Sequence, residues 1–274
     1  MATGRLAPTP SGRLHLGNAA AVGAAWLSAR AAGGTLLLRV EDIDTERSRP
    51  ELIDALRADL AWLGLTWDRE VPAQSTRDYA AALRQLAQVT YRCTCTRAMI
   101  QAAGGVYPGT CRDAGHTEGA VRLRLPSGVA RFVDRRVGPV EVDLATLGDP
   151  VLVRRDGLVG YNLAVVVDDV RDGVDEVVRG ADLLEHTAVQ LSLWQALGAA
   201  PPTWLHAPLI LGADGRKLGK SHGSLEIAAL RAAGWSPADV WRVVLPWLGM
   251  PGHDQLDPTA FNAAAVRPGP IQLS

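Results

Sequence analysis

The sequence predicts an α/β fold, and three observations indicate it. An extended run at Arg5–Ala7 is followed by an alanine-rich, helix-favouring stretch from Ala19 to Ala32 and by an apolar run from Thr35 to Val40. Such a strand–helix–strand unit sets two parallel strands side by side, and an unbroken apolar run is typical of a strand buried on both faces. The alternation of expected strands and helices resumes at Val151, after residues 91–150, a segment that contains all three cysteines.

The remaining elements follow in chain order. We expect helices from Pro50 to Leu63 and from about Asp78 to Gln88, and a helix that begins at Ser236-Pro237 in a helical tail. The Asp156-Gly157 pair signals a hairpin turn, so the chain from Leu158 onward is expected to be extended, with Asp168 and Asp169 at a strand end. Further strands are expected over residues 121–125, 140–143, 151–155, 174–178 and 205–211, and a helix over 182–197.

The composition is that of an ordinary globular protein. Of 274 residues, 47% are apolar and 21% are charged, and the net charge is −1, so no global positive charge indicates a DNA-binding protein. No apolar run reaches membrane-spanning length, and the first residues lack the apolar core of a signal peptide. We therefore expect a cytoplasmic, monomeric protein without a DNA or membrane partner.

Only two lysines occur in the chain, Lys217 and Lys220, among 28 Lys+Arg. Lysine places a compact charge on a flexible stem, which the planar fork of arginine does not replace. Two lysines retained so close together therefore indicate neutralisation of phosphate oxygens. A solvated loop that happens to keep both lysines is the alternative.

A second motif, His15-Leu16-Gly17-Asn18, lies where the first strand turns into the first helix. The free backbone N–H groups and the dipole of a helix start favour an anion there. His15 can donate to a phosphate, and Gly17 lets a flat base lie against the backbone. A surface histidine beside a glycine turn is the alternative for this motif taken alone.

Three cysteines, Cys93, Cys95 and Cys111, lie within one short segment. Three thiolates at this spacing predict a tetrahedral structural zinc site that lacks one ligand. Ligand chemistry alone favours His116 as the fourth ligand, since imidazole is a commoner zinc ligand than phenolate. Three buried cysteines without a metal are the alternative.

Together, the histidine and lysine motifs resemble the HxGH and KMSKS signatures of class I aminoacyl-tRNA synthetases. Asn18 stands in place of the second histidine of the first signature, Gly219 where a serine is usual in the second, and Thr9 where serine is common. The resemblance extends over nearly the whole chain and narrows to the glutamyl-tRNA synthetase branch, on the runs Arg5–Gly12, Arg39–Asp44, Tyr161–Asp169 and Val178–Asp182.

Within that branch, the short tail after the second signature and the cysteine pattern resemble the glutamyl-Q tRNA(Asp) synthetases. The resemblance implies a Rossmann-type class I synthetase catalytic domain with a zinc-binding insertion and a short helical C-terminal subdomain, without an anticodon-binding domain. The implied boundaries are 1–90 and 151–224 for the two halves of the Rossmann domain, 91–150 for the insertion and 225–274 for the subdomain.

The resemblance also implies the site. His15, Lys217 and Lys220 would be catalytic. ATP would bind at His15, Gly17, Asn18 and Lys220. The metal would be held by Cys93, Cys95, Tyr107 and Cys111, with Tyr107 in the place that chemistry alone gave to His116. Glutamate would bind at Arg5, Leu6, Ala7, Pro8, Thr9, Glu41, Tyr161 and Arg179, since arginines clamp carboxylates and an acid pairs with the ammonium.

The implied activity is the ATP-dependent activation of L-glutamate, with Mg²⁺ bound to the ATP, and transfer of the glutamyl group to queuosine-modified tRNA(Asp). A truncated glutamyl-tRNA synthetase that charges tRNA(Glu), or an idle paralogue that binds only RNA or zinc, is the alternative. An exposed basic face for the RNA is expected to include Arg122, Arg124, Arg131, Arg135, Arg136, Arg154 and Arg155, although a solvated arginine-rich surface explains them equally well.

Overall fold

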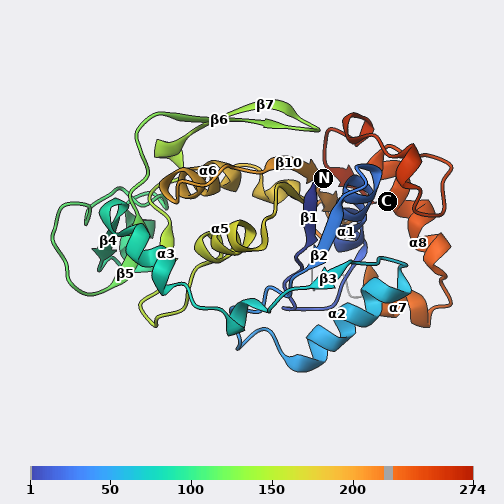
Figure 1. Ribbon diagram of the computed structural model, residues 1–274, viewed down its shortest axis with the longest axis horizontal. Coiled ribbons are helices and arrows are strands. Elements are labelled where there is room, and N and C mark those ends of the chain that lie inside the picture. The colour runs from blue at the N-terminus through green and yellow to red at the C-terminus, as the bar shows by residue number, and fades with distance from the viewer. Residues whose placement is uncertain (1, 219–224, 274) are drawn as a thin grey trace.

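Residues 3–70 form a parallel sheet with helices between its strands, which confirms the α/β prediction. The computed structural model describes residues 2–218 and 225–273. Strands β1 (Thr3–Leu6), β2 (Thr35–Leu38) and β3 (Arg69–Glu70) pair in parallel in the order β1-β2-β3. Helix α1 (Leu16–Ala31) follows β1, and helix α2 (Pro50–Trp62) follows β2 (Figure 1).

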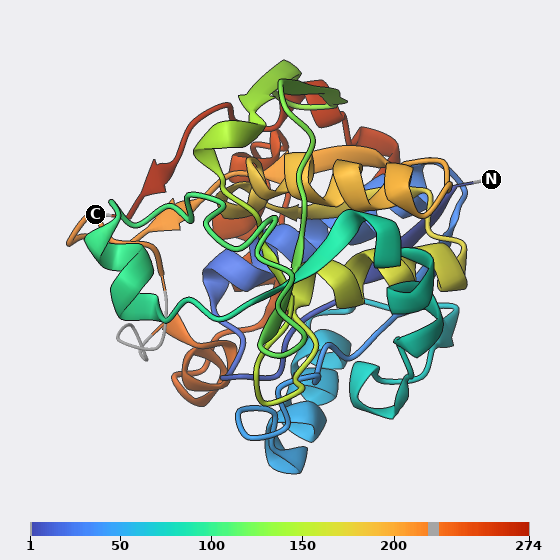
Figure 2. The same ribbon diagram turned by 90° about the vertical axis from the view of Figure 1, so that its left-hand side faces the viewer.

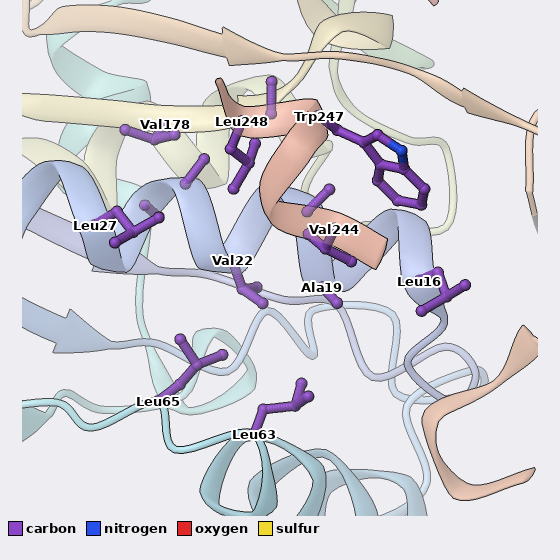
Figure 3. Packing of buried hydrophobic residues seen from close by; sticks show 14 of the residues in the cluster. Leu16, Ala19, Val22, Leu27, Leu63, Leu65, Val178, Val244, Trp247 and Leu248 are labelled. Carbon is purple, nitrogen blue, oxygen red and sulfur yellow. The ribbon is translucent and has the colours of Figure 1, made fainter. Parts of the chain in front are cut away.

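Helix α1 is the centre of the first hydrophobic core. It begins earlier than the alanine run predicts, because His15 caps its first turn. Its small residues let neighbouring elements approach closely: a Cβ on Gly23 would lie 2.8 Å from the ring of Trp241 on α8 (Pro237–Val244). Figure 3 shows Val22 on the side of this helix that faces Leu63 and Leu65, with Val178 and Leu248 on its opposite side. This close packing fixes the position of helix α1 and therefore the position of its N-terminus.

A second sheet has the order β7-β6-β10-β9 and joins distant parts of the chain. Strand β10 (Thr203–Ala207) pairs in parallel with both β6 (Val129–Asp134) and β9 (Glu176–Gly180), and β7 (Gly138–Asp143) is antiparallel to β6. The β6–β7 hairpin reaches along the top of the molecule to β10 (Figure 1). Part of the predicted 91–150 insertion is therefore continuous with the sheet of the second half.

The third sheet, with the order β4-β5-β8, lies at the opposite end of the molecule from α8 (Figure 1). Its antiparallel strands are β4 (Thr90–Cys93), β5 (Ala120–Leu123) and β8 (Val151–Val153), with helices α3 (Ala80–Gln85) and α4 (Arg97–Ala102) nearby. Figure 2, which faces this end, shows green segments in front of the yellow and gold helices. Because β8 pairs with β5, hydrogen bonding crosses the predicted boundary at residue 150.

The expectation of an extended chain after Leu158 is wrong. A turn at Asp156-Gly157 does bring Val153 opposite Val159, but the chain then forms helix α5 (Tyr161–Asp172), which packs beside α6 (His186–Ala196). Asp168 and Asp169 therefore lie on a helix. Their apolar, β-branched neighbours favour a strand locally, but full burial in the second core stabilises the helix instead.

The C-terminal segment is helical at first and ends as a strand. Helix α7 (Ile227–Ala232) precedes α8, whose predicted start is confirmed by a capping box between Ser236 and Asp239. The expectation of a purely helical tail is wrong, because β12 (Ile271–Gln272) pairs with β11 (Ile210–Leu211). Within residues 2–218 and 225–273, every helix is too short or too polar to cross a membrane. Short 3₁₀ turns occur at Gln74–Thr76, Ala87–Val89, Leu144–Thr146, Ala181–Leu183, Leu245–Leu248, Pro258–Ala260 and Ala263–Ala265.

Candidate active site

A cavity of about 530 Å³ lies where β1, β9 and β10 end and α1 begins. The carboxyl edge of parallel strands is where α/β proteins commonly bind ligands, because connecting loops and helix starts meet there. Lys220 lies outside the described residues. The other residues predicted for glutamate, ATP or catalysis all line this one cavity, and they are Arg5, Leu6, Ala7, Pro8, Thr9, His15, Gly17, Asn18, Glu41, Tyr161, Arg179 and Lys217.

The His15–Asn18 turn is built as a reciprocal cap. The Nδ1 of His15 accepts from the backbone N–H of Asn18 at 3.3 Å, and the Oδ1 of Asn18 accepts from the backbone N–H of His15 at 3.1 Å. A neutral imidazole that accepts at Nδ1 carries its proton on Nε2, so it can donate there. A Cβ on Gly17 would lie 3.0 Å from Cε1 of His15. The glycine therefore leaves room for the imidazole as well as for a ligand.

Beneath the cavity, Asp169 holds two buried arginines. Its Oδ1 accepts from Nη2 of Arg39 at 2.7 Å and from Nε of Arg5 at 3.3 Å. Arg39, whose side chain is fully buried, also donates to Glu41 at 3.2 Å and to Asp172 at 3.1 Å. Arg39 and Asp169 were not predicted as site residues. The two adjacent acids, Asp168 and Asp169, are the signal available in the sequence. The expected strand end does not predict that Asp169 pairs with Arg5 and Arg39.

Glu41 lines the cavity, where burial and the neighbouring arginines act on its carboxyl group in opposite directions. Burial raises the pKa of Glu41, and the neighbouring Arg39 and Arg5 oppose that rise. The pairing of Glu41 with Arg39 coexists with its place in the cavity wall. A substrate ammonium at Glu41 would add a further positive charge and so stabilise the carboxylate.

Arg179 enters the cavity from β9 already held by the protein. Its Nε donates to Nε2 of His206 at 3.1 Å, its Nη1 to Oε1 of Gln190 at 2.6 Å, and its Nη2 to Oγ1 of Thr187 at 2.8 Å. Nη2 also donates to the carbonyl of Leu183 at 3.3 Å. A bidentate clamp on a substrate carboxylate would therefore displace one of these partners, whereas a single hydrogen bond from a fixed guanidinium would not.

The first of the two lysines closes one side of the cavity. Lys217 donates to Oδ2 of Asp182 at 2.5 Å, and its backbone pairs with Leu211 in an isolated bridge. After residues 219–224 in the sequence, Glu226 forms a β-bridge with His15. The backbone N–H of Ile227 donates to the carbonyl of Leu14 at 2.8 Å. The chain therefore lies beside the histidine motif again at Glu226 and Ile227.

The three cysteines converge, as a metal site requires. Their sulfur atoms all lie within 4.8 Å of one another, and the sulfur atoms of Cys95 and Cys111 are 3.6 Å apart. Two thiolates on one zinc at about 2.3 Å would be separated by a similar distance. Although burial opposes it, hydrogen bonds from Thr94, Cys95 and other neighbours lower the pKa of Cys111 to about 6, which favours the thiolate.

Both candidates for the fourth ligand lie close to this cluster. The hydroxyl of Tyr107, which is buried, accepts from the backbone N–H of Cys111 at 2.8 Å. His116 is more exposed, and its Nε2 lies 3.4 Å from the hydroxyl of Thr94, which is itself 4.0 Å from the sulfur of Cys111. The guanidinium of Arg122 covers the ring of Tyr107, 3.9 Å from its centroid.

Arg122 departs from the expected basic face, whereas Arg131, Arg135, Arg154 and Arg155 are exposed. Arg122 is 7% exposed and donates to the carbonyl of Asp149, so it cannot contact RNA from an open surface. Arg135 pairs with Glu176, and Arg136 donates to the carbonyl of His206. Of the expected face, Arg122 alone is buried, because β5 turns it into the third sheet, while Arg135 and Arg136 make interior contacts from more exposed positions.

Comparison with known proteins gives a consistent result. The family model for the catalytic domain of class I tRNA synthetases (E and Q) matches residues 1–104 and 110–256. The glutamyl-Q tRNA(Asp) synthetase of Nitratidesulfovibrio vulgaris is 45% identical over 282 residues, covering 91% of this chain and 87% of the relative. That of Pseudomonas aeruginosa PAO1 is 48% identical over 237 residues, covering 84% and 81%.

Among solved structures, a glutamate tRNA ligase from Elizabethkingia meningosepticum, crystallised in complex with its amino acid, superposes with a TM-score of 0.86 at 25% identity. The match covers 100% of this chain and 67% of that one. The resemblance drawn from the motifs is thereby confirmed: the chain belongs to the class I tRNA synthetase (E and Q) catalytic-domain family.

Proposed function

We propose that the protein activates L-glutamate with ATP and transfers the glutamyl group to the queuosine base of tRNA(Asp). The observation that carries the proposal is the single cavity that contains both the helix-start turn at His15 and the arginine–glutamate set. The named relatives, 45% and 48% identical over most of their length, support the enzyme class and the acceptor.

In the first step, the α-carboxylate oxygen of glutamate forms a bond to the α-phosphorus of ATP, and the bond from that phosphorus to the leaving pyrophosphate oxygen breaks. Two anions must meet, so the protein contributes orientation and positive charge and needs no covalent nucleophile. Nε2 of His15 donates to a phosphate oxygen, while Gly17 and Asn18 keep that ring in place. Mg²⁺ accompanies ATP and is held mainly by its phosphates.

The lysines neutralise the charge that moves onto the pyrophosphate. Lys217 is paired with Asp182 in this structure, and we assign it a supporting role, with Lys220 as the main partner of the phosphates. Arg5 and Arg179 orient the glutamate carboxylates, Glu41 holds the ammonium and Tyr161 donates its hydroxyl. In the second step, a hydroxyl of the cyclopentenediol ring of queuosine attacks the acyl carbon. AMP leaves with the bonding electrons of the acyl–oxygen bond, and the hydroxyl proton passes to a phosphate oxygen of AMP.

The proposal also covers the division of the chain and its metal. Residues 1–90 and 151–224 would form the two halves of the catalytic unit, 91–150 the metal-binding segment, whose β6–β7 hairpin pairs with the sheet of the second half, and 225–274 the C-terminal subdomain. Cys93, Cys95, Cys111 and Tyr107 would hold one zinc ion, which would cross-link β4 to the following loop. The protein would act as a monomer on tRNA(Asp).

The decisive test measures ATP–pyrophosphate exchange with glutamate in the absence of tRNA, followed by transfer of labelled glutamate to tRNA(Asp) with and without queuosine. We expect exchange with glutamate and labelling only of the queuosine-containing tRNA. Absence of exchange would contradict the enzyme, and labelling of tRNA(Glu) alone would contradict the acceptor and favour a truncated glutamyl-tRNA synthetase.

For the metal, we expect about one zinc ion per chain after gentle purification, as a closed structural site implies. Tyr107→Phe should weaken zinc retention against a chelator by about 10- to 100-fold, as the loss of one interaction at a metal site does, whereas His116→Ala should leave it unchanged. The measurement is the release of zinc to a chromogenic chelator. A zinc content near zero in the unaltered protein would contradict the site, and the reverse order of the two variants would give the fourth position to His116.

A further inference from the structure

A chain of three buried polar side chains lies behind the cavity, and none of its inner members was predicted as a site residue. His206 on β10 is fully buried and lies between Asp134, the last residue of β6, and Arg179 on β9. Its Nδ1 is 2.7 Å from Oδ2 of Asp134, and its Nε2 is 3.1 Å from Nε of Arg179. Parallel pairing places His206 directly opposite Arg179, so the contact follows from the strand register.

The two neighbours of the imidazole determine its protonation. Both oxygens of Asp134 accept two hydrogen bonds: Oδ1 from the backbone N–H groups of Arg136 and Val137, at 3.0 and 2.9 Å, and Oδ2 from the backbone N–H and Nδ1 of His206. Such a carboxylate only accepts, so Nδ1 carries a proton. Because Nε of Arg179 only donates, Nε2 must be bare.

The charges around His206 agree with a neutral ring. Burial lowers its pKa, and the guanidinium groups of Arg179 and Arg136 act in the same direction, while Asp134 opposes them. Burial raises the pKa of the Asp134 carboxyl group. Hydrogen bonds from His206, Val137 and Arg136 outweigh this effect and lower the pKa overall. The carboxylate is therefore ionised and the imidazole neutral at ordinary pH.

The imidazole accepts from Nε of Arg179, and Thr187 lies against both groups, with its Oγ1 3.3 Å from Nε2 of His206. Gln190 and Thr187 belong to α6, and Leu183 belongs to the turn after β9. Among the described residues, 2–218 and 225–273, Asp134 and His206 do not line the cavity. They can therefore act on a substrate only through Arg179, whose planar guanidinium must keep one orientation to meet a carboxylate.

We infer that Asp134 and His206 are positioning residues for glutamate recognition: Asp134 selects the Nδ1–H tautomer of His206, and the bare Nε2 then sets the plane of Arg179. The inference rests on the proposed function. It also explains why residues 129–143 pair into the catalytic sheet, since that pairing brings Asp134 to His206.

Asp134→Asn tests the selection of the tautomer. The amide keeps one accepting oxygen, and its NH₂ must face either the two N–H groups of His206 or those of Arg136 and Val137, so the hold on Nδ1–H is weakened in either orientation. We expect the KM for glutamate in the exchange assay to rise about tenfold to a hundredfold, as for loss of a hydrogen bond to a charged group, with the KM for ATP unchanged. Glu141→Gln is the matched control, because it removes an exposed carboxylate from the same hairpin.

Two substitutions at 206 separate positioning from a merely structural role. His206→Gln places an acceptor near the position of Nε2, within reach of Arg179, but does not serve Asp134. The shorter side chain of His206→Asn can donate to Asp134 but cannot reach Arg179. Positioning predicts a lower glutamate KM for His206→Gln than for His206→Asn. It also predicts that Asp134→Asn adds no further increase in the His206→Gln background.

The outcomes distinguish this inference from the proposed function. Absence of glutamate-dependent exchange in the unaltered protein would overturn the proposed function. If the unaltered protein shows normal exchange, two results would overturn the positioning role alone. One is a folded Asp134→Asn variant with an unchanged KM for glutamate. The other is a KM for glutamate in His206→Asn that is no higher than in His206→Gln. The pair at 206 retains this power if Asp134→Asn does not fold.

Discussion

Asp169→Asn is expected to lower the free energy of unfolding by about 3–5 kcal/mol, the usual effect of removing one partner from a buried ion pair. Asp169 is 3% exposed and accepts from Arg39 at 2.7 Å and from Arg5 at 3.3 Å. The amide has the same size but no charge, so two buried guanidinium groups lose their shared counter-ion. Arg39 is affected most, since its Nε already lacks a hydrogen-bond partner.

Urea denaturation of the variant and the unaltered protein at one pH measures this effect as a shift of the midpoint. The control is Asp54→Asn, which removes an exposed carboxylate 3.4 Å from Arg57 and should cost less than about 1 kcal/mol. Equal midpoints for the two variants would show that Glu41 and Asp172 compensate Arg39 without Asp169. At temperatures where the variant is folded, exchange should also weaken, because Arg5 lines the cavity.

Arg179→Lys is expected to lower kcat/KM for glutamate on the order of a hundredfold or more, because several hydrogen bonds to a charged group are lost together. The charge is kept, but an ammonium cannot reach His206, Gln190 and Thr187 at once as the planar fork does. The substrate carboxylate then meets a cation that is free to turn, so part of the binding energy is spent on ordering it.

Exchange kinetics with glutamate varied at saturating ATP measure this loss. Arg131→Lys is the matched control, since Arg131 lies on β6, is 68% exposed in its side chain and pairs only at the surface with Glu141. A variant at 179 with nearly normal kcat/KM would mean that charge alone suffices there, and it would remove the basis for the positioning role of His206.

The order of the elements and the members of the cavity were largely predictable from the sequence. The strand–helix–strand start, the capped helix at Ser236 and the convergence of His15 with Arg5, Glu41 and Arg179 follow from local patterns and from the resemblance. Local patterns suffice there because periodicity, caps and turn residues report on the backbone within a few positions.

The helix at Tyr161–Asp172 was not predictable in this way. Its β-branched run favours a strand, and only its burial against α6 and the second sheet selects the helix. The same helix brings Asp169 beneath Arg5 and Arg39. A pairing between residues more than 100 positions apart leaves no local trace, so the two acids could be noticed but their partners could not be named.

The sequence by itself determined the family, the α/β class and the chemistry of the cavity, because those depend on residue types at characteristic spacings. Only the tertiary structure decided what holds the cavity together: the pairing of β6 with β10, the chain from Asp134 through His206 to Arg179, and the shared carboxylate of Asp169. The physical reason is that a buried polar group must find its partner across the fold, and strand register and helix packing choose that partner.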